Sequence, residues 1–439
     1  MALRLRRTSA FLVAVTTMIA MLAGSAAPSP LYPVYRQLWG FSTFTLTVIF
    51  AVYVAALLAA LLTAGSLSDQ IGRRPVVGAG LVLLAAAMVL FIAAQGVGGL
   101  IAARILQGVA TGLITGAVTA MIVDLQPHAR AGALATGISP ALGMAIGSLL
   151  SGALLQWAPW PRFLVFWILL AGDLLLALLV ALMPPMPARR ADHERIRFRT
   201  VLGSLRPSVG VVRAVRPAFL AQLPAVASTW ALGGLYLALG SSIVAGLLGV
   251  TNHFYGAAVL AAFFASAALA APVFRVLSES RRRPAGFGAL GIGVLLTMVA
   301  ALNHSLTLDI VGSVLAGLGF GLTWLTVMSV LAAATPAEHR GQTFAAVYVA
   351  SYIAFSVPAL VAGLAVNRLG MLPTVVGYAC FDLLLVIAAS VAAGLELRRR
   401  RRPIPAELSG ETVDDLDEDP VDDLLIAAPM QPASCSSQS

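Results

Sequence analysis

Lysine is absent from this sequence, and charged residues of every kind are scarce. All 28 basic residues in the 439-residue chain are arginine, and charged side chains make up 11% of it. A soluble domain averages about 25% charged residues, and a Walker A phosphate loop requires a lysine. The composition therefore argues against a soluble protein and excludes a Walker-type ATPase.

Cysteine and histidine are also rare. The two cysteines, Cys380 and Cys435, have neither metal-ligand nor disulfide spacing. The five histidines lie in or near predicted loops, and the sequence has no H-E-x-x-H or G-x-S-x-G motif. We therefore expect no metal, no cofactor and no enzymatic activity.

What the chain has instead is hydrophobic residues, which make up 59% of it. They fall into blocks of roughly 20 residues, the length of a helix that crosses a lipid bilayer. This pattern predicts an all-α membrane protein with twelve transmembrane helices, which lie near 9–27, 45–64, 76–95, 99–122, 132–155, 162–183, 217–240, 253–275, 285–302, 306–333, 342–366 and 373–395.

The first block has two interpretations. Arg4, Arg6 and Arg7 precede an apolar run and a group of small residues, as in a cleaved signal peptide. The alternative is a retained first helix. An internal repeat favours retention, because a design of six plus six helices needs this helix.

The repeat consists of three matches at an offset of 209 or 210 residues. Each match joins the first half of the chain to the second: "LSDQIGRRP" (67–75) with "LSESRRRP" (277–284), "QPHARAGALA" (126–135) with "PAEHRGQTFA" (336–345), and "AGDLLLALL" (171–179) with "CFDLLLVIA" (380–388). The matches predict two pseudo-symmetric six-helix bundles, residues 1–183 and 217–396. A linker loop, 184–216, would join them, and 397–439 would form a disordered tail.

The arginines predict the orientation. With the N-terminus in the cytoplasm, only Arg36, Arg162 and Arg368 face outward and Arg104 lies within a helix. Cytoplasmic loops carry an excess of arginine, so both termini, the linker and the tail are expected in the cytoplasm. The positions of the arginines beside membrane segments also favour this explanation of the net charge of +9 over nucleic-acid binding.

Two motifs resemble a known family. "GSLSDQIGRRP" (65–75) resembles G-x-L-x-D-x-x-G-R-[RK], the signature between helices two and three of the major facilitator superfamily, and "RILQGVATG" (104–112) resembles R-x-x-Q-G of its fourth helix. The resemblance covers nearly all of residues 9–396 and implies a secondary transporter with the fold of that family. "LGMAIGSLLSG" (142–152) departs from the antiporter signature G-P-x-x-G-G at Met144 and Ser148, which puts antiport in doubt.

Glycines recur inside several predicted helices. Gly143 and Gly147 are the positions of the antiporter signature that this sequence keeps as glycine, and they predict a contact between helices through small residues. The same interpretation applies to two further groups: Gly108, Gly112 and Gly116, and Gly317, Gly319 and Gly321.

The first motif is expected to act in gating. Asp69 can pair with Arg73, and Asp124 can extend that pair. In the resembled family, the corresponding residues form a latch between the two halves, although the arginines could instead only fix the topology. The predicted gating residues are Gly65, Leu67, Asp69, Gly72, Arg73, Arg74 and Asp124.

Ionisable groups at membrane depth are hypotheses for function by default. Asp173 and Asp382 lie near the middle of predicted helices and are candidates for proton coupling, unless they serve a structural hydrogen bond. Arg104 is a third candidate, with a snorkelling side chain as the alternative. Asp309, like Asp69 and Asp124, is placed at a helix end, closer to water.

The resemblance also implies which helices line a central cavity. The substrate candidates on those helices are Gln107, Gln222, Trp230, Tyr236, Trp324, Tyr348 and Tyr352. This set is apolar and favours neutral or amphipathic substrates. We expect a monomeric transporter in the plasma membrane, of the bacterial inner-membrane kind, that exports small hydrophobic compounds and is driven by protons. Alternatives are uptake or uniport of a small metabolite, and a sensor that does not transport.

Overall fold

The computed structural model describes residues 5–64, 67–184 and 209–400, except for the side chains of Ala64, Asp69, Ala337 and 397–400. Gly65, residues 185–208 of the predicted linker and residues 401–439 of the predicted tail lie outside it. The described residues form helices and no strands. Twelve of these helical segments are long and apolar enough to cross a membrane, as the sequence predicted.

The helices of the first half follow the predicted blocks. They are α1 (Arg7–Ala26), η1 (Ser29–Leu31), α2 (Tyr32–Trp39), α3 (Thr43–Ala64), α4 (Leu67–Ile71), α5 (Arg73–Ala93), α6 (Val97–Leu125), α7 (Ala129–Trp157) and α8 (Leu164–Ala181). The predicted first span, 9–27, is too short, because η1 and α2 continue it to Trp39.

The second half repeats this pattern with one irregular segment. Its helices are α10 (Arg216–Leu235), η2 (Tyr236–Gly240), α11 (Ser241–Gly246), α12 (His253–Val276), α13 (Glu279–Leu302), α14 (Leu306–Ala334), η3 (Ala337–His339), α15 (Arg340–Leu369) and α16 (Met371–Arg400). The segment η2 is a π-helix within the seventh span. The ninth span begins at Glu279, six residues before the predicted boundary.

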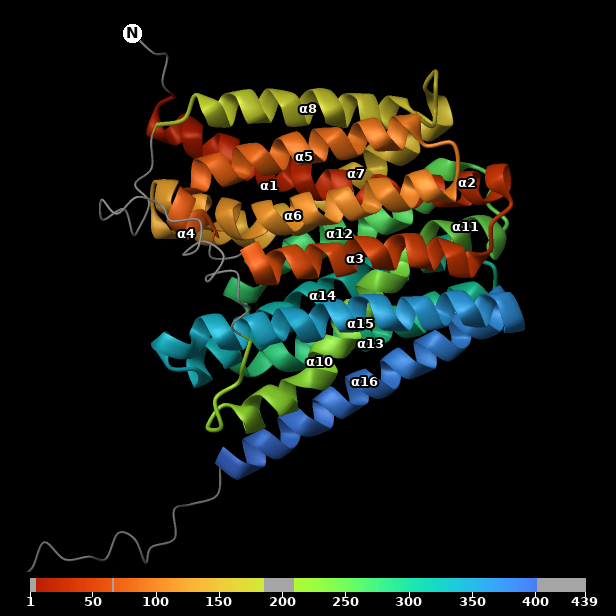
Figure 1. Ribbon diagram of the computed structural model, residues 1–439. Helices are drawn as coiled ribbons and strands as arrows, with labels where there is room; N and C mark the ends of the chain where they lie inside the picture. Colours follow the sequence, from red (N-terminus) through yellow and green to blue (C-terminus); the bar gives the residue numbers. More distant parts are fainter. Residues whose placement is uncertain (1–4, 65–66, 185–208, 401–439) are drawn as a thin grey trace, which may run out of the picture. The chain divides into compact units, whose positions relative to one another are not determined.

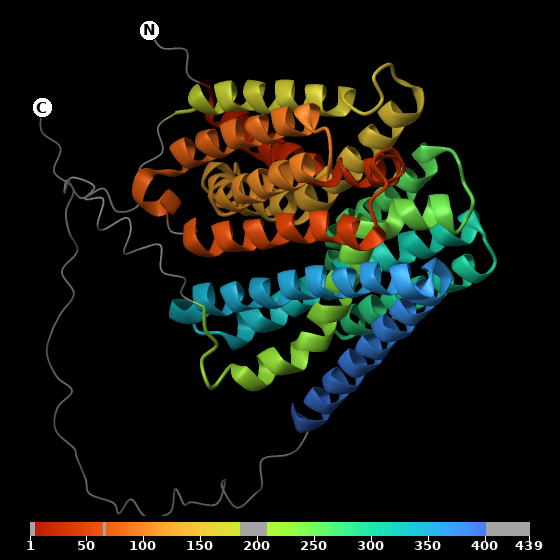
Figure 2. The same cartoon turned by 45° about the vertical axis from the view of Figure 1, so that its right-hand side comes forward.

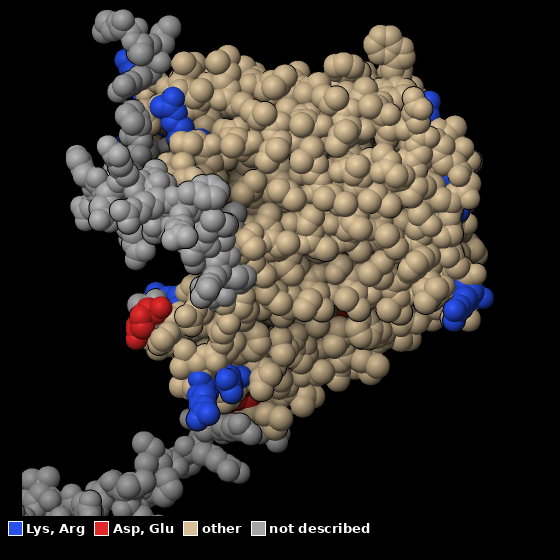
Figure 3. Space-filling view, viewed as in Figure 1, with Lys and Arg blue, Asp and Glu red and all other residues tan. Residues whose placement is uncertain are grey.

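The composition of the helices explains their packing. Every backbone group inside a bilayer must be paired, which helices achieve on their own. On the face shown in Figure 3, most of the arginines and carboxylates that can be seen lie at two opposite edges, with uncharged residues between them. This distribution matches helices whose ends meet water and whose middle meets lipid.

Glycines bring particular helices into close contact. A methyl group at Gly143 or Gly147 of α7 would overlap the backbone of α1, at Ile19 and Ala23 respectively. Gly108 and Gly112 of α6 lie equally close to the backbone of α3. The predicted glycine contacts are therefore confirmed, except at Gly116, where a methyl group would have no neighbour within 4 Å.

The α3–α6 contact recurs in the second half. Gly317 and Gly321 of α14 pack on Phe263 and Ala267 of α12, the same pairing as Gly108 with Tyr53 and Gly112 with Leu57. All four residues of the second contact follow their counterparts by 209 or 210 positions, the offset of the sequence repeat. The duplication therefore has a counterpart in helix packing.

The two sets of helices meet through α3 with α15 and through α7 with α12. Figures 1 and 2 both show α3 running alongside α15. The rings of Phe50 and Phe355 lie 5.1 Å apart in this contact. In the other, the His253 backbone N–H donates to Gln156 Oε1 at 3.0 Å.

We expect replacement of Gly147 by alanine to destabilise the fold. The added methyl group meets backbone atoms, which cannot rotate away, and overpacking of this kind costs about 1–3 kcal/mol. Gly172 of α8 is the matched control, because a methyl group there has no neighbour within 4 Å. Thermal unfolding in detergent should show a lower melting temperature for Gly147→Ala and an equal or higher one for Gly172→Ala. Equal melting of the two variants would contradict the proposed contact.

Candidate functional site

Four of the predicted substrate residues form one aromatic cluster. Trp230 of α10 lies at its centre, with ring centroids 5.2 Å from Trp324 and 5.4 Å from Tyr352. Tyr348 continues the cluster, 6.2 Å from Trp324 and 6.3 Å from Tyr352. These four side chains are half-buried, so part of their ring surface stays accessible.

The cluster also contains residues that sequence reasoning missed. Phe320 and Phe355 lie 6.2 and 5.5 Å from the Trp230 ring. Trp230 Nε1–H is buried and has no acceptor among the described residues. A buried donor without an acceptor requires an explanation, and a polar atom of a ligand would supply one.

The other substrate candidates are buried, unlike the four half-buried rings. Gln222 is buried in α10. Tyr236 stacks on Phe263 with centroids 4.3 Å apart, and Phe263 lies 5.5 Å from Phe320, so Tyr236 adjoins the cluster. Gln107 is fully buried in α6, where its amide donates to the Gly24 carbonyl oxygen at 2.8 Å. A substrate contact by Gln107 would require this bond to break, and that role stays a prediction.

Arg104 of α6 is buried, with 1% of its surface exposed. Its guanidinium donates to Tyr32 Oη, to the Ser25 carbonyl oxygen at 3.0 Å, and to Gln107 Oε1 at 2.7 Å. Its Cζ also lies 5.1 Å from the centre of the Tyr53 ring. The side chain does not extend to the surface, as the snorkelling alternative required, but binds the end of α1.

The local fold explains why Arg104 fits there. The last carbonyl groups of a helix have no partner within it and carry partial negative charge. Here α1 ends at Ala26 inside the protein, and Arg104 and Gln107 supply the donors to two of its carbonyl groups. Sequence reasoning selected both residues but not their partners, because backbone acceptors leave no signal in a sequence.

Asp173 and Asp382 both lie in the interior of helices, as predicted. They are 3% and 0% exposed. Neither carboxyl oxygen of Asp382 has a hydrogen-bond partner among the described residues. Ser228 of α10 faces Asp382, but outside hydrogen-bonding geometry.

The expectation that Asp309 lies close to water is wrong. It is the fourth residue of α14, yet only 8% of its surface is exposed. Helices α12 and α13 pack against α14, and Val259 of α12 and Thr297 of α13 line a small cavity together with Asp309. Burial of a helix end depends on tertiary packing, which the position of a residue within its helix does not reveal.

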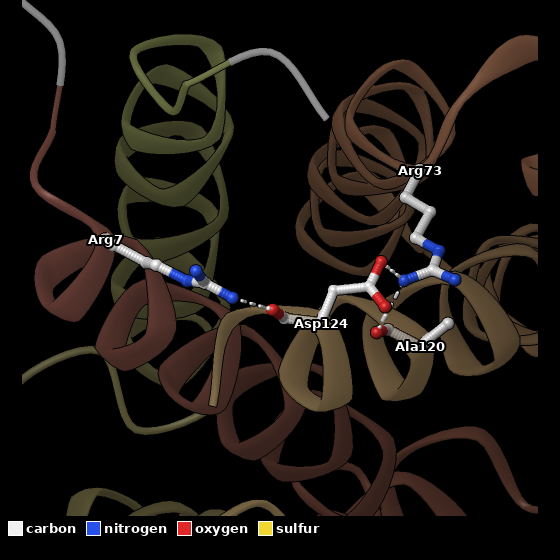
Figure 4. Close-up of polar contacts among 4 residues, drawn as sticks. All are labelled: Arg7, Arg73, Ala120 and Asp124. Atoms are coloured by element: carbon white, nitrogen blue, oxygen red, sulfur yellow. Dashed lines mark hydrogen bonds and ion pairs between the residues drawn. The ribbon is translucent and has the colours of Figure 1, made fainter. Parts of the chain in front are cut away.

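The loop motif joins helices of the first half. Arg73 forms an ion pair with Asp124 and donates to the Ala120 carbonyl oxygen, and Arg7 donates to the Asp124 backbone oxygen at 2.8 Å (Figure 4). Arg74 donates to the carbonyl oxygens of Met183 and Ala181 at the end of the sixth span. Figure 1 shows α5 between α6 and α8, the two helices that these arginines reach.

Other residues of this motif have separate places. Gly72 precedes α5 with φ +99°, a conformation that favours glycine. Leu67 is half-buried in α4. Gly65 and the Asp69 side chain lie outside the described residues, so the pairing of Asp69 with Arg73 and the latch between the halves stay predictions.

The described residues contain no group of three or more His, Cys, Asp or Glu side chains able to hold a metal ion. Cys380 is an exposed free thiol.

Comparison with solved structures finds transporters. A bacterial homolog of the human lysosomal transporter Spinster, solved in an inward-facing and unoccupied conformation, has a TM-score of 0.68 and 14% identity, covering 91% of this chain and 99% of that one. A POT family transporter in complex with 5-aminolevulinic acid also has a TM-score of 0.68, with 15% identity over 87% of this chain and 95% of its own. No curated protein matches the sequence significantly.

The family model described as Major Facilitator Superfamily matches twice, over residues 13–243 and 218–433. Together the matches cover most of the chain and include both motifs. The solved transporters share the fold, and the twelve apolar helices fit a multi-pass membrane protein. The chain therefore belongs to the Major Facilitator Superfamily of membrane transporters.

Proposed function

We propose that this transporter exports small hydrophobic or amphipathic compounds in exchange for protons, by alternating access between its two six-helix halves. The halves are residues 1–183 and 217–396. The arginine distribution supports an orientation in the plasma membrane with both termini in the cytoplasm.

The observation that carries the proposal is the aromatic cluster around Trp230. Its rings come from three helices, α10, α14 and α15, and none of its members is charged. Aromatic rings bind apolar surface, and the indole N–H of Trp230 adds one directional donor. A cluster of this composition suits a neutral or amphipathic molecule better than a sugar or a dicarboxylate.

Proton coupling is supported by the buried carboxylates. Asp382 is the strongest acceptor candidate, because burial without a hydrogen-bond partner leaves its charge uncompensated. Asp173 is the related position of the first half. Arg104 donates hydrogen bonds to Tyr32, to the Ser25 carbonyl oxygen and to Gln107, so we assign it the positioning of α1 rather than the carriage of a proton.

Reconstituted vesicles test the proposal. A panel of fluorescent amphipathic dyes, assayed with and without an imposed pH gradient, should include dyes whose export depends on the gradient. Trp230→Ala should reduce the apparent affinity for such a dye about tenfold, since an aromatic contact contributes about 0.5–1.5 kcal/mol beyond buried area. Trp167→Ala is the matched control, because this tryptophan of α8 is 50% exposed and should leave export unchanged.

Two results would overturn parts of the proposal. Gradient-driven dye movement in the opposite direction would establish uptake in place of export. Equal affinities of wild type and Trp230→Ala would remove the aromatic cluster from the substrate site.

A further inference from the structure

A small cavity lies beside the beginning of α14. Its volume is about 40 Å³, and most of its lining is apolar, including Leu232, Val259 and Val375. Asp309 and Tyr236 are the titratable residues in this lining. One water needs about 10–15 Å³ by this kind of measure, so the cavity has room for water molecules but not for a drug-sized compound, whose pockets start at about 300 Å³.

Asp309 is an unusual residue for such a place. It is more than nine-tenths buried, and no described side chain forms a hydrogen bond or an ion pair with its carboxyl group. An acidic residue in the first turn of a helix is also favoured by the helix dipole. That explanation is incomplete here, because the Ser305 hydroxyl already caps α14 and an exposed aspartate would serve the dipole without desolvation.

The π-helix η2 forms part of the cavity wall. Such segments are rare and frequently mark functional sites. Tyr236 and Gly240 of η2 line the cavity, and Tyr236 Oη hydrogen-bonds with Ser313 Oγ at 2.8 Å, one turn after Asp309.

Tyr236 lies near Asp382 as well as near Asp309. On α16, Val375 lines the cavity, and Asp382 follows it by two turns on the same face. Of the nearby histidines, His304 directs Nδ1 to the Leu247 carbonyl oxygen, and His253 is the first residue of α12, directly after the capping residue Asn252.

The chemistry of the lining favours a proton over a metal cation. A bound metal ion replaces its water shell with several oxygen ligands. The side chains of this cavity offer oxygen only from Asp309, Tyr236 and Thr297. A carboxylate needs just one water molecule to exchange a proton.

We propose that Asp309, in the cavity that it shares with Tyr236, is a proton-binding site of this transporter. Hydronium in the cavity transfers its proton to the Asp309 carboxylate and becomes water, and the reverse step releases the proton. The site's use in transport rests on the proposed proton-coupled function. The binding of the proton itself does not.

Infrared spectroscopy of the purified full-length protein tests the site without a substrate. Protonated carboxyl groups have a carbonyl-stretching band that moves in D2O and disappears on deprotonation. We expect wild type to lose such a band as the pH is raised, and Asp309→Asn to lack that component. Glu279→Gln is the matched control, since it removes an exposed carboxyl group at the beginning of α13, and it should retain the component.

The site proposal is overturned if Asp309→Asn has the wild-type spectrum at every pH. It is also overturned if Na⁺ removes the band at constant pH, which would make the occupant a metal cation. Should Asp309→Asn fail to fold, Asp309→Glu replaces it. Glutamate retains a carboxyl group in a changed position, so its band must move in frequency or in titration midpoint, and an unchanged band contradicts the proposal.

Dye transport separates this site from the function. We expect Asp309→Asn to reduce gradient-driven export at least tenfold. If wild type exports dye and Asp309→Asn does so equally well, the site is overturned while the transporter proposal stands. If wild type moves no dye but the infrared component depends on Asp309, the proton site stands and the proposed export function fails.

Discussion

Arg104→Ala is expected to abolish dye transport and to destabilise the protein. The substitution removes the donor from Tyr32 Oη, from the Ser25 carbonyl oxygen and from Gln107 Oε1. A buried partner left unpaired costs about 1–3 kcal/mol, so three of them should lower the free energy of unfolding by about 3 kcal/mol or more. Transport should fail because the end of α1 loses the hydrogen bond from Arg104 of α6 to the Ser25 carbonyl oxygen.

Thermal unfolding and dye transport are the two measurements. Arg104→Lys should recover only part of either, because an ammonium group lacks the planar fork that reaches three acceptors. Arg162→Ala is the matched control: its Cζ lies 5.1 Å from the Phe163 ring near the surface, a contact of about 0.5–1 kcal/mol. If Arg104→Ala unfolds and transports like Arg162→Ala, the network does not hold α1.

The second large effect is expected at Asp382. Replacement by asparagine preserves the shape of the side chain but removes its ability to bind a proton. We expect gradient-driven export to fall at least tenfold while exchange of labelled for unlabelled dye continues. Because neither carboxyl oxygen accepts a hydrogen bond from a described residue, no network is lost and the protein should remain folded.

Substitutions of other carboxyl residues show whether the loss of export belongs to Asp382. Glu279→Gln changes an exposed carboxyl group in the same way and should leave export unaffected. If Asp382→Asn retains full gradient-driven export and Asp173→Asn loses it, the proton site belongs to the first half. Full export by both variants would remove these two carboxylates from coupling.

Much of the fold could be predicted because the signals are local. Apolar blocks of membrane length predict helices without reference to their neighbours, and the spacing of Gly143 and Gly147 predicts a close contact. The π-helix at Tyr236–Gly240 has no comparable signal. Its hydrogen-bond pattern depends on how the seventh span packs against α12 and α14.

The site was less predictable than the fold. The types of Trp230, Trp324, Tyr348 and Tyr352 and the helices they occupy were sufficient to select them, but their assembly around Trp230 depends on three helices meeting. The sequence position of Asp309 places it near a helix end and closer to water, whereas the depth of a side chain depends on what covers that end. The sequence makes Arg104 a candidate, but its acceptor on α1 is a backbone carbonyl oxygen, which every residue possesses.

The repeated glycine contacts have a mechanical consequence. Where Gly108 and Gly112 meet α3, and where Gly317 and Gly321 meet α12, the backbones of the two helices approach closely, and only alanine and serine side chains lie beside the glycines. Such small side chains have few rotamers, so these contacts have little freedom to deform when one helix is displaced. A displacement at one end of α6 or α14 should therefore be transmitted to the other end of the same helix. We expect the deformable contacts to be those where larger side chains separate the helices, as Phe50 and Phe355 do.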